Sequence, residues 1–251
     1  MTLISLLLLT ALLPYLSHSA SFEVGIINGT EAEPHSRPYM VSIQEKGKHI
    51  CGGILVSKRF VLTAAHCRKK KKHITAVLGA HDLSDKKDGS IRMKVKKYYR
   101  HLKYNAETHD NDIMLVKLCG KAKKSKTVNW ISIPKTNEDI KANTVCSLAG
   151  WGGAGSSNHV SERLMETNIT IVDETECNKV WENRLTPRMM CALHPGGSCK
   201  GDSGDPLVCG DTAVGIAAFG QMDNCDAPTK PKVFTKICEF LPWIKSVIGK
   251  V

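Results

Sequence analysis

The chain has 251 residues, of which 42% are hydrophobic and 24% are charged. This composition is that of an ordinary globular protein of one or two domains, and it excludes disordered and collagen-like chains. The chain contains 35 Lys and Arg residues and 24 Asp and Glu residues, so its formal net charge is +11. This positive charge favours contact with polyanions of any kind. Ten cysteines fit either a disulfide framework or metal sites.

The N-terminal segment decides between these two uses of cysteine. A leucine-rich run at residues 6–13 is too short to span a bilayer, and small polar residues follow it. We predict a signal peptide over residues 1–20 and no membrane span in the rest of the chain. In the oxidising secretory pathway an even cysteine count indicates disulfides, and the lack of a Cys-x-x-Cys pair argues against structural zinc. Glycosylation sequons begin at Asn28 and Asn168.

Short runs of β-forming residues recur along the chain, separated by turn residues. This pattern predicts an all-β barrel or sandwich. From Phe240 to Val247, apolar residues fall at i, i+3, i+4 and i+7, so we expect a short helix over Glu239–Ile248. The expected strands are Tyr39–Ile43, Gly53–Val56, Phe60–Thr63, Thr75–Leu78, Ile113–Val116, Asn168–Val172 and Thr212–Phe219.

Three short segments carry the chemistry: Thr63–Cys67 around a histidine, Asp112–Val116, and Gly201–Gly204 around a serine. A serine hydroxyl needs a base to take its proton. Histidine titrates in the required range, and a buried carboxylate fixes its tautomer. Glycines beside the serine let backbone N–H groups approach an oxyanion without a Cβ clash. Each segment alone fits a structural role, but the three together predict nucleophilic catalysis.

From Ile26 onward the chain resembles the chymotrypsin-like serine peptidases. The resemblance implies an all-β fold of two six-stranded antiparallel Greek-key barrels with a short C-terminal helix. The barrels would cover residues 26–128 and 129–251, with the active site between them. Besides the three segments, the resemblance rests on Cys51-Gly52-Gly53, Leu148–Gly152 and Pro242-Trp243-Ile244.

The resemblance also implies a role for each catalytic residue. His66 would be the general base and acid, Asp112 its orienting partner and Ser203 the nucleophile that forms an acyl-enzyme. The backbone N–H groups of Gly201 and Ser203 would form the oxyanion hole. No metal or cofactor is implied.

An activation device is implied as well. Residues 21–25 would be a propeptide whose removal frees the ammonium of Ile26 to pair with Asp202, and such a buried ion pair acts as a switch. The propeptide contains no Lys or Arg, so a trypsin-like activator has no site there. This arrangement resembles that of granule-stored peptidases.

Cysteine positions agree with the resemblance. It implies four bridges, and it leaves Cys119 and Cys238 either paired with each other or as free thiols. The implied bridges are Cys51–Cys67, Cys146–Cys209, Cys177–Cys191 and Cys199–Cys225.

The segment Val77–His81 and the short propeptide resemble the branch of granzymes, mast-cell chymases and cathepsin G. Gly197 falls at the base of the specificity pocket, where trypsin-like members carry Asp, so a strict Lys or Arg preference is not expected. Lys232 would face this pocket and favour an acidic P1 residue through a charge-assisted hydrogen bond. If its ammonium reaches solvent instead, the pocket would take aromatic residues or Leu. The other expected pocket residues are Ala218, Phe219 and Gly220.

Two residues depart from the family pattern. Asp205 stands where the motif usually has Gly, and Ala218 stands where a serine commonly contacts the triad Asp. We expect these changes to reduce activity without abolishing it, because the three triad residues are all present.

The basic segments support a rival function: a catalytically weak or silent cationic protein that binds glycosaminoglycan or acts against microbes. We favour a secreted, granule-stored serine endopeptidase because the triad is intact. Expected partners are protein or peptide substrates and sulfated glycosaminoglycan, with no nucleic acid, and we expect a monomer. The basic segments are Arg68–His73, then Lys94, Lys96, Lys97 and Arg100, and then Lys121, Lys123, Lys124 and Lys126.

Overall fold

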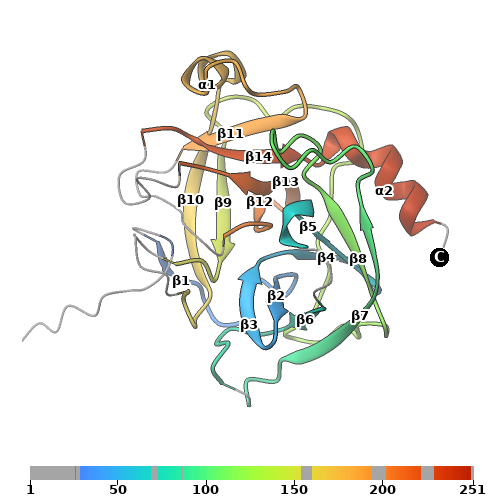
Figure 1. Ribbon diagram of the computed structural model, residues 1–251. Coiled ribbons are helices and arrows are strands. Elements are labelled where there is room, and N and C mark those ends of the chain that lie inside the picture. The colour runs from blue at the N-terminus through green and yellow to red at the C-terminus, as the bar shows by residue number, and fades with distance from the viewer. Residues whose placement is uncertain are drawn as a thin grey trace, which may run out of the picture.

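The computed structural model describes residues 26, 29–68, 73–85, 87–153, 160–193, 202–221 and 229–249. Their strands form two antiparallel sheets, each curled into a barrel, with little helix around them (Figure 1). The prediction of a two-barrel all-β fold is confirmed. The predicted signal peptide, the propeptide and the sequon at Asn28 lie outside the described residues.

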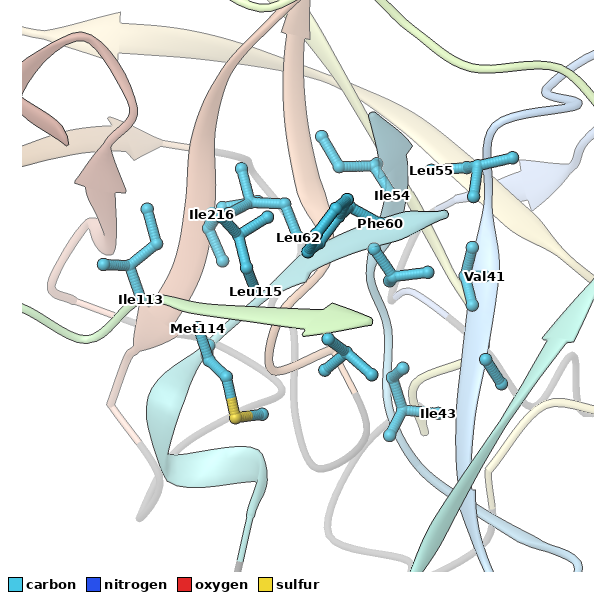
Figure 2. Close-up of a cluster of buried hydrophobic side chains, with 14 of the residues drawn as sticks. Val41, Ile43, Ile54, Leu55, Phe60, Leu62, Ile113, Met114, Leu115 and Ile216 are labelled. Carbon is cyan, nitrogen blue, oxygen red and sulfur yellow. The ribbon is translucent and has the colours of Figure 1, made fainter. Parts of the chain in front are cut away.

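The first barrel has the strand order β3-β2-β6-β7-β8-β5-β4. A bridge between Met40, just before β2, and Ile54 of β4 closes it. Apolar side chains from facing strands fill the interior, as Figure 2 shows for Val41, Leu62 and Leu115. Its strands are β2 (Val41–Glu45), β3 (Lys48–Cys51), β4 (Ile54–Ser57), β5 (Phe60–Thr63), β6 (Ile74–Leu78), β7 (Ile91–Arg100) and β8 (Met114–Leu118).

The second barrel has the order β1-β10-β11-β14-β13-β12-β9, and pairing of β9 with β10 closes it. Its core contains Leu148, Met190, Leu207 and Phe234, all nearly inaccessible to solvent. Its strands are β1 (Thr30–Glu31), β9 (Val145–Gly150), β10 (Met165–Val172), β11 (Met189–Leu193), β12 (Pro206–Cys209), β13 (Thr212–Phe219) and β14 (Lys232–Lys236).

Each sheet therefore contains seven described strands where six were expected. In the first barrel, β3 and β4 are two parts of one stretch interrupted at Gly52 and Gly53. In the second, the two-residue β1 adds an N-terminal segment to the edge of β10. The extra strands therefore come from a break and a short addition.

Two helices are described. The C-terminal helix α2 (Leu241–Ile248) follows a 3-10 turn at Cys238–Phe240, so the expected helix begins two residues later than predicted. Helix α1 (Glu174–Val180) was not predicted. The carboxylate of Asp173 caps it by accepting hydrogen bonds from the backbone N–H groups of Thr175 and Glu176. Within the described part of the chain, no helix is long and apolar enough to cross a membrane.

Three disulfides tie these elements together. Cys51–Cys67 joins β3 to the turn after β5, Cys146–Cys209 joins β9 to β12, and Cys177–Cys191 joins α1 to β11. The fourth implied bridge, Cys199–Cys225, lies outside the described residues.

The two remaining cysteines are free. Cys119 is exposed after β8, whereas Cys238 is buried at the start of the last 3-10 turn, and the structure does not join them. Of the two alternatives left by the sequence, the structure therefore has free thiols. Burial raises the pKa of Cys238, so this thiol stays protonated and unreactive.

Candidate active site

Strand pairing brings His66 and Asp112 together. In the β5–β8 ladder, Thr63 lies opposite Met114, so the 3-10 turn that follows β5 sits beside the residues that precede β8. His66 Nδ1 lies 2.6 Å from Asp112 Oδ2, and the backbone N–H of His66 donates to Asp112 Oδ1 at 2.9 Å. Both carboxylate oxygens are thus directed at one residue, which fixes the imidazole ring.

Asp112 is fully buried and remains ionised. Burial acts to raise its pKa, but interactions with His109 and His66 outweigh burial and hold the pKa below its ordinary value. Its backbone carbonyl accepts a hydrogen bond from Thr235 Oγ1 on β14 at 3.1 Å. Asp112 is therefore held between the two barrels.

His109 was missed by the sequence interpretation. Its Nδ1 lies 3.5 Å from Asp112 Oδ2, which is an electrostatic contact longer than a good hydrogen bond. Its ring packs edge-on against His66, with centroids 5.6 Å apart, and lies 5.3 Å from the ring of Phe219. One histidine among ten carries no signal in a single sequence, since only the turn before β8 brings it to the site.

The turn of Ser203 packs directly against the first barrel. The Ser203 carbonyl accepts a hydrogen bond from Gly52 N–H at 2.8 Å, and Cys67 Sγ lies 3.8 Å from the same carbonyl oxygen. Gly204 has φ +84°, and a Cβ there would lie 2.4 Å from both the Gly52 carbonyl and Thr63 Oγ1. Only glycine fits this position, and it brings Ser203 next to the turn of His66. Gly201 lies outside the described residues.

Ile26 and Asp202 both lie in the second barrel. The side chain of Ile26 is 3% exposed and packs in the core that contains Leu148 and Met190. Asp202 is fully buried against Gly152, where an added Cβ would lie 1.8 Å from Asp202 Oδ1. Any residue with a Cβ at position 152 would collide with this carboxylate, so glycine is required there.

Lys232, the pocket lysine of the sequence prediction, reaches Asp202. Its Nζ lies 3.6 Å from Asp202 Oδ2, and its side chain is 12% exposed. Its Cγ is 3.8 Å from the Cβ position of Gly220, so the stem borders the expected pocket wall. The ammonium therefore has a carboxylate partner inside the protein and does not extend freely to solvent.

Asp205 is the most unusual charge of the site. It is fully buried, and neither of its oxygens has a hydrogen-bond partner within the described part of the chain. Its φ is not positive, so its Cβ strains no left-handed backbone. Burial first, and the charge of Asp202 second, raise its pKa well above the ordinary value, while the ammonium of Lys232 opposes them.

The other expected pocket residues lie along the end of β13. Ala218 is buried, and the Phe219 ring packs edge-on against Trp181 with centroids 5.2 Å apart. Trp181 Nε1 donates to the carbonyl of Pro231 at 3.0 Å, which ties the pocket wall to the start of β14. Gly197 lies outside the described residues.

His66, His109 and Asp112 also bring potential metal-ligand atoms within 4.8 Å of one another. A cation bound there would compete with the proton between His66 Nδ1 and Asp112 Oδ2. We therefore interpret this group as an acid–base pair with a third residue beside it.

Comparison with known proteins agrees with this geometry. The trypsin family model matches residues 26–244. Rat granzyme-like protein 1 is 40% identical over 98% of both chains, and rat granzyme M is 41% identical over 98% of this chain and 97% of its own. Bovine duodenase-1 is 41% identical, covering 99% of this chain and 97% of its own. Mouse neuropsin, a serine protease, superposes with a TM-score of 0.82 at 33% identity over 89% of this chain and all of its own. The chain belongs to the trypsin family of serine proteases and is a serine endopeptidase.

Proposed function

We propose that the mature enzyme begins at Ile26 and cleaves peptide bonds with His66, Asp112 and Ser203. His66 takes the proton of Ser203 Oγ as the oxygen attacks the scissile carbonyl, and Asp112 stabilises the imidazolium. The N–H groups of Gly201 and Ser203 hold the oxyanion. His66 then protonates the leaving amine, and water hydrolyses the acyl-enzyme. The observation that carries this proposal is the pair of hydrogen bonds from His66 to the buried Asp112 carboxylate.

Activation follows from removal of residues 21–25. Two observations support this step. The family match starts at Ile26, and the side chain of Ile26, directly after the proposed cleavage site, is buried in the second barrel. Cleavage would give Asp202 a second cation besides Lys232. N-terminal sequencing of protein purified from a secreting cell tests this step, and a start at any residue other than Ile26 contradicts it.

For substrate choice we propose acidic P1 residues, recognised by Lys232. The lysine stem lies beside Gly220, and its ammonium is largely removed from water, which strengthens its attraction for a carboxylate. The ion pair with Asp202 draws charge away from the substrate and favours the alternative, an aromatic or Leu P1 residue. Cleavage of a peptide library that varies the P1 residue, by the processed enzyme, decides between the acidic and the aromatic or Leu preference. Cleavage after Phe or Leu with none after Asp or Glu ends the acidic proposal.

A sulfated polysaccharide is the second partner we propose, in keeping with storage in secretory granules. In the β7–β8 ladder Lys97 lies opposite Lys117, and like charges in this position repel. Desolvation first, and the charges of Lys96, Arg59 and Lys97 next, lower the pKa of Lys117. This crowding of cations would be relieved by a bound polyanion.

Heparin chromatography tests this partner. Lys96→Gln with Lys97→Gln should elute at lower salt than wild type, because two exposed charges of the crowded patch are lost. Lys48→Gln with Lys245→Gln is the matched control, since it removes two exposed charges from other elements. Equal elution of the two double variants would contradict a specific patch.

A further inference from the structure

The turn before β8 is held in place by contacts with the second barrel. His109 and Asn111 both have left-handed backbone, with φ 55° and 56°. Between them, Asp110 accepts hydrogen bonds from Arg188 Nη2 at 2.9 Å and Nε at 3.2 Å, and from Thr186 Oγ1 at 3.0 Å. Left-handed backbone outside glycine persists where the surroundings fix it. The turn therefore holds the His109 side chain in one place.

This turn directs a buried nitrogen at the triad. The Nδ1 atom of His109 is inaccessible to solvent and has no hydrogen-bond partner within the described part of the chain. Asp112 Oδ2 lies 3.5 Å from it. A lone pair on Nδ1 would face the negative oxygen and be repelled, so the tautomer with its proton on Nδ1 is favoured.

The remaining gap is small. A buried N–H without an acceptor costs free energy, and closing the gap by about 0.5 Å would bring the two atoms within hydrogen-bond range. Hydrogen bonds of a catalytic site are often long before substrate binds and shorten in the complex. Asp112 Oδ2 is therefore the acceptor to which this N–H can donate during the reaction.

The His109 ring is confined by its neighbours. Its edge-on contact with His66 has a centroid distance of 5.6 Å, and the Phe219 ring lies 5.3 Å away at a tilt of 36°. Ala218, which precedes Phe219, has no side-chain donor to offer the triad. The polar side-chain contacts of the Asp112 carboxylate come from His66 and His109.

The electrostatics of Asp112 agree with this geometry. Burial raises the pKa of Asp112, and the contact with His109 is the largest of the influences that bring it below its ordinary value. The imidazolium that forms at His66 is stabilised by an ionised carboxylate. A donor at His109 supports that carboxylate without exchanging a proton with the substrate.

We propose that His109 is a positioning residue of the triad: neutral and protonated on Nδ1, it donates to Asp112 Oδ2 and keeps this carboxylate ionised and aligned while His66 carries the proton of Ser203. This inference rests on the proposed function. In this role His109 touches no reacting atom, so loss of its donor should lower kcat and leave KM unchanged.

The test separates the donor from the ring. His109→Asn keeps an N–H donor near the place of Nδ1 and tolerates left-handed backbone, whereas His109→Phe keeps a ring without a donor. kcat and KM are measured on enzyme processed to Ile26, with a peptide amide chosen from the P1 library. His109→Phe should lower kcat roughly tenfold to a hundredfold, the range expected for a hydrogen bond to a charged group. His109→Asn should keep most of kcat.

His35 offers a matched control. It also has left-handed backbone, with φ 61°, and a buried Nδ1 without a hydrogen-bond partner among the described residues. Its ring lies edge-on to His81, with centroids 6.3 Å apart, rather than to His66. His35→Phe makes the same exchange on the same kind of backbone and should leave kcat unchanged. A loss equal to that of His109→Phe would assign the effect to backbone strain and overturn the inference.

A double-mutant cycle tests whether His109 acts through Asp112. In the Asp112→Asn background, which we expect to be roughly ten-thousandfold slower than wild type, His109→Phe should have little further effect, because the charge it supports is gone. The same loss in both backgrounds overturns the inference. So does an equal loss in the Asn and Phe variants of His109, an unchanged kcat in the Phe variant, or a change confined to KM.

The proposed function is checked separately in the same experiment. Competent enzyme is counted by labelling Ser203 to completion with a fluorophosphonate, so misfolded protein does not enter kcat. Labelled wild-type enzyme with any of the overturning results refutes only the role of His109. Wild-type enzyme that takes no label refutes the proposed function instead.

Discussion

Asp205 places an ionisable group in one of the most tightly enclosed positions of the molecule, between Gly52 and Gly150. The sequence identified the departure, but its consequence could not be predicted, because the glycines that surround it come from two different barrels. His109 is a similar case, since its contact with Asp112 depends on the left-handed turn before β8. The triad itself could be predicted because its residue types and order are set by the chemistry.

The raised pKa of Asp205 predicts how stability depends on pH. In the uncleaved Ser203→Ala protein, the folded state holds the Asp205 proton more tightly than the unfolded state does, through burial and the charge of Asp202 against that of Lys232. As pH rises from the ordinary Asp pKa of about 4 through the raised pKa, this group makes the free energy of unfolding fall. Asp205→Asn should flatten that fall in thermal unfolding measured against pH. Parallel curves for the two proteins would contradict the prediction.

The close packing around Gly204 predicts that a side chain there is not tolerated, and Gly210 offers a matched comparison. Gly204→Ala should abolish labelling of Ser203, because the new Cβ would collide with the Gly52 carbonyl and Thr63 Oγ1. Gly210 also has positive φ, but open space surrounds its Cβ position. Gly210→Ala should therefore cost only roughly 1–2 kcal/mol of stability and keep full labelling. Equal labelling of the two variants would show that the contacts of Gly204 are unimportant.

Among the elements, β5 and β8 could be predicted because they are short, continuous apolar runs. Strand β7 was missed because its lysines were interpreted as a basic cluster. Met93 and Val95 are half-buried, and Lys94 and Lys96 between and beyond them are exposed, which is the alternation of a strand with one solvated face. The many lysines of β7 therefore hide its alternation of half-buried and exposed residues in the sequence.

The sequence does contain a start signal for helix α1, which the prediction did not include. Asp173 stands at the N-cap position, and two acidic residues follow it in the first turn. Asp173→Ala should lower the free energy of unfolding by about 1 kcal/mol, because two backbone N–H groups lose their acceptor. Asp173→Ser should restore most of it. Denaturant unfolding of the three proteins checks this, and the peptidase activity should not change. An Ala variant as stable as wild type would show that the cap contributes nothing.

At the scale of the molecule, the two barrels and the site between them follow from pairing that the sequence indicates only in outline. The β5–β8 ladder brings His66 to Asp112, and the hydrogen bond from Gly52 to the Ser203 carbonyl joins the nucleophile turn to the first barrel. The expected fold and branch were confirmed by the structure and the relatives. The exact strand count and the ion pair of Lys232 with Asp202 could not be predicted, because they depend on where strands break and on which side chains meet across the second barrel.

The central claim is that Ser203, activated by His66 and Asp112, is the nucleophile of a working endopeptidase. Active-site titration with a fluorophosphonate on protein processed to Ile26 tests it most directly. We predict stoichiometric labelling of Ser203, with no labelling in Ser203→Ala and a fall in peptide hydrolysis of roughly a millionfold in that variant. Processed, folded wild-type protein that takes up no label would contradict the account.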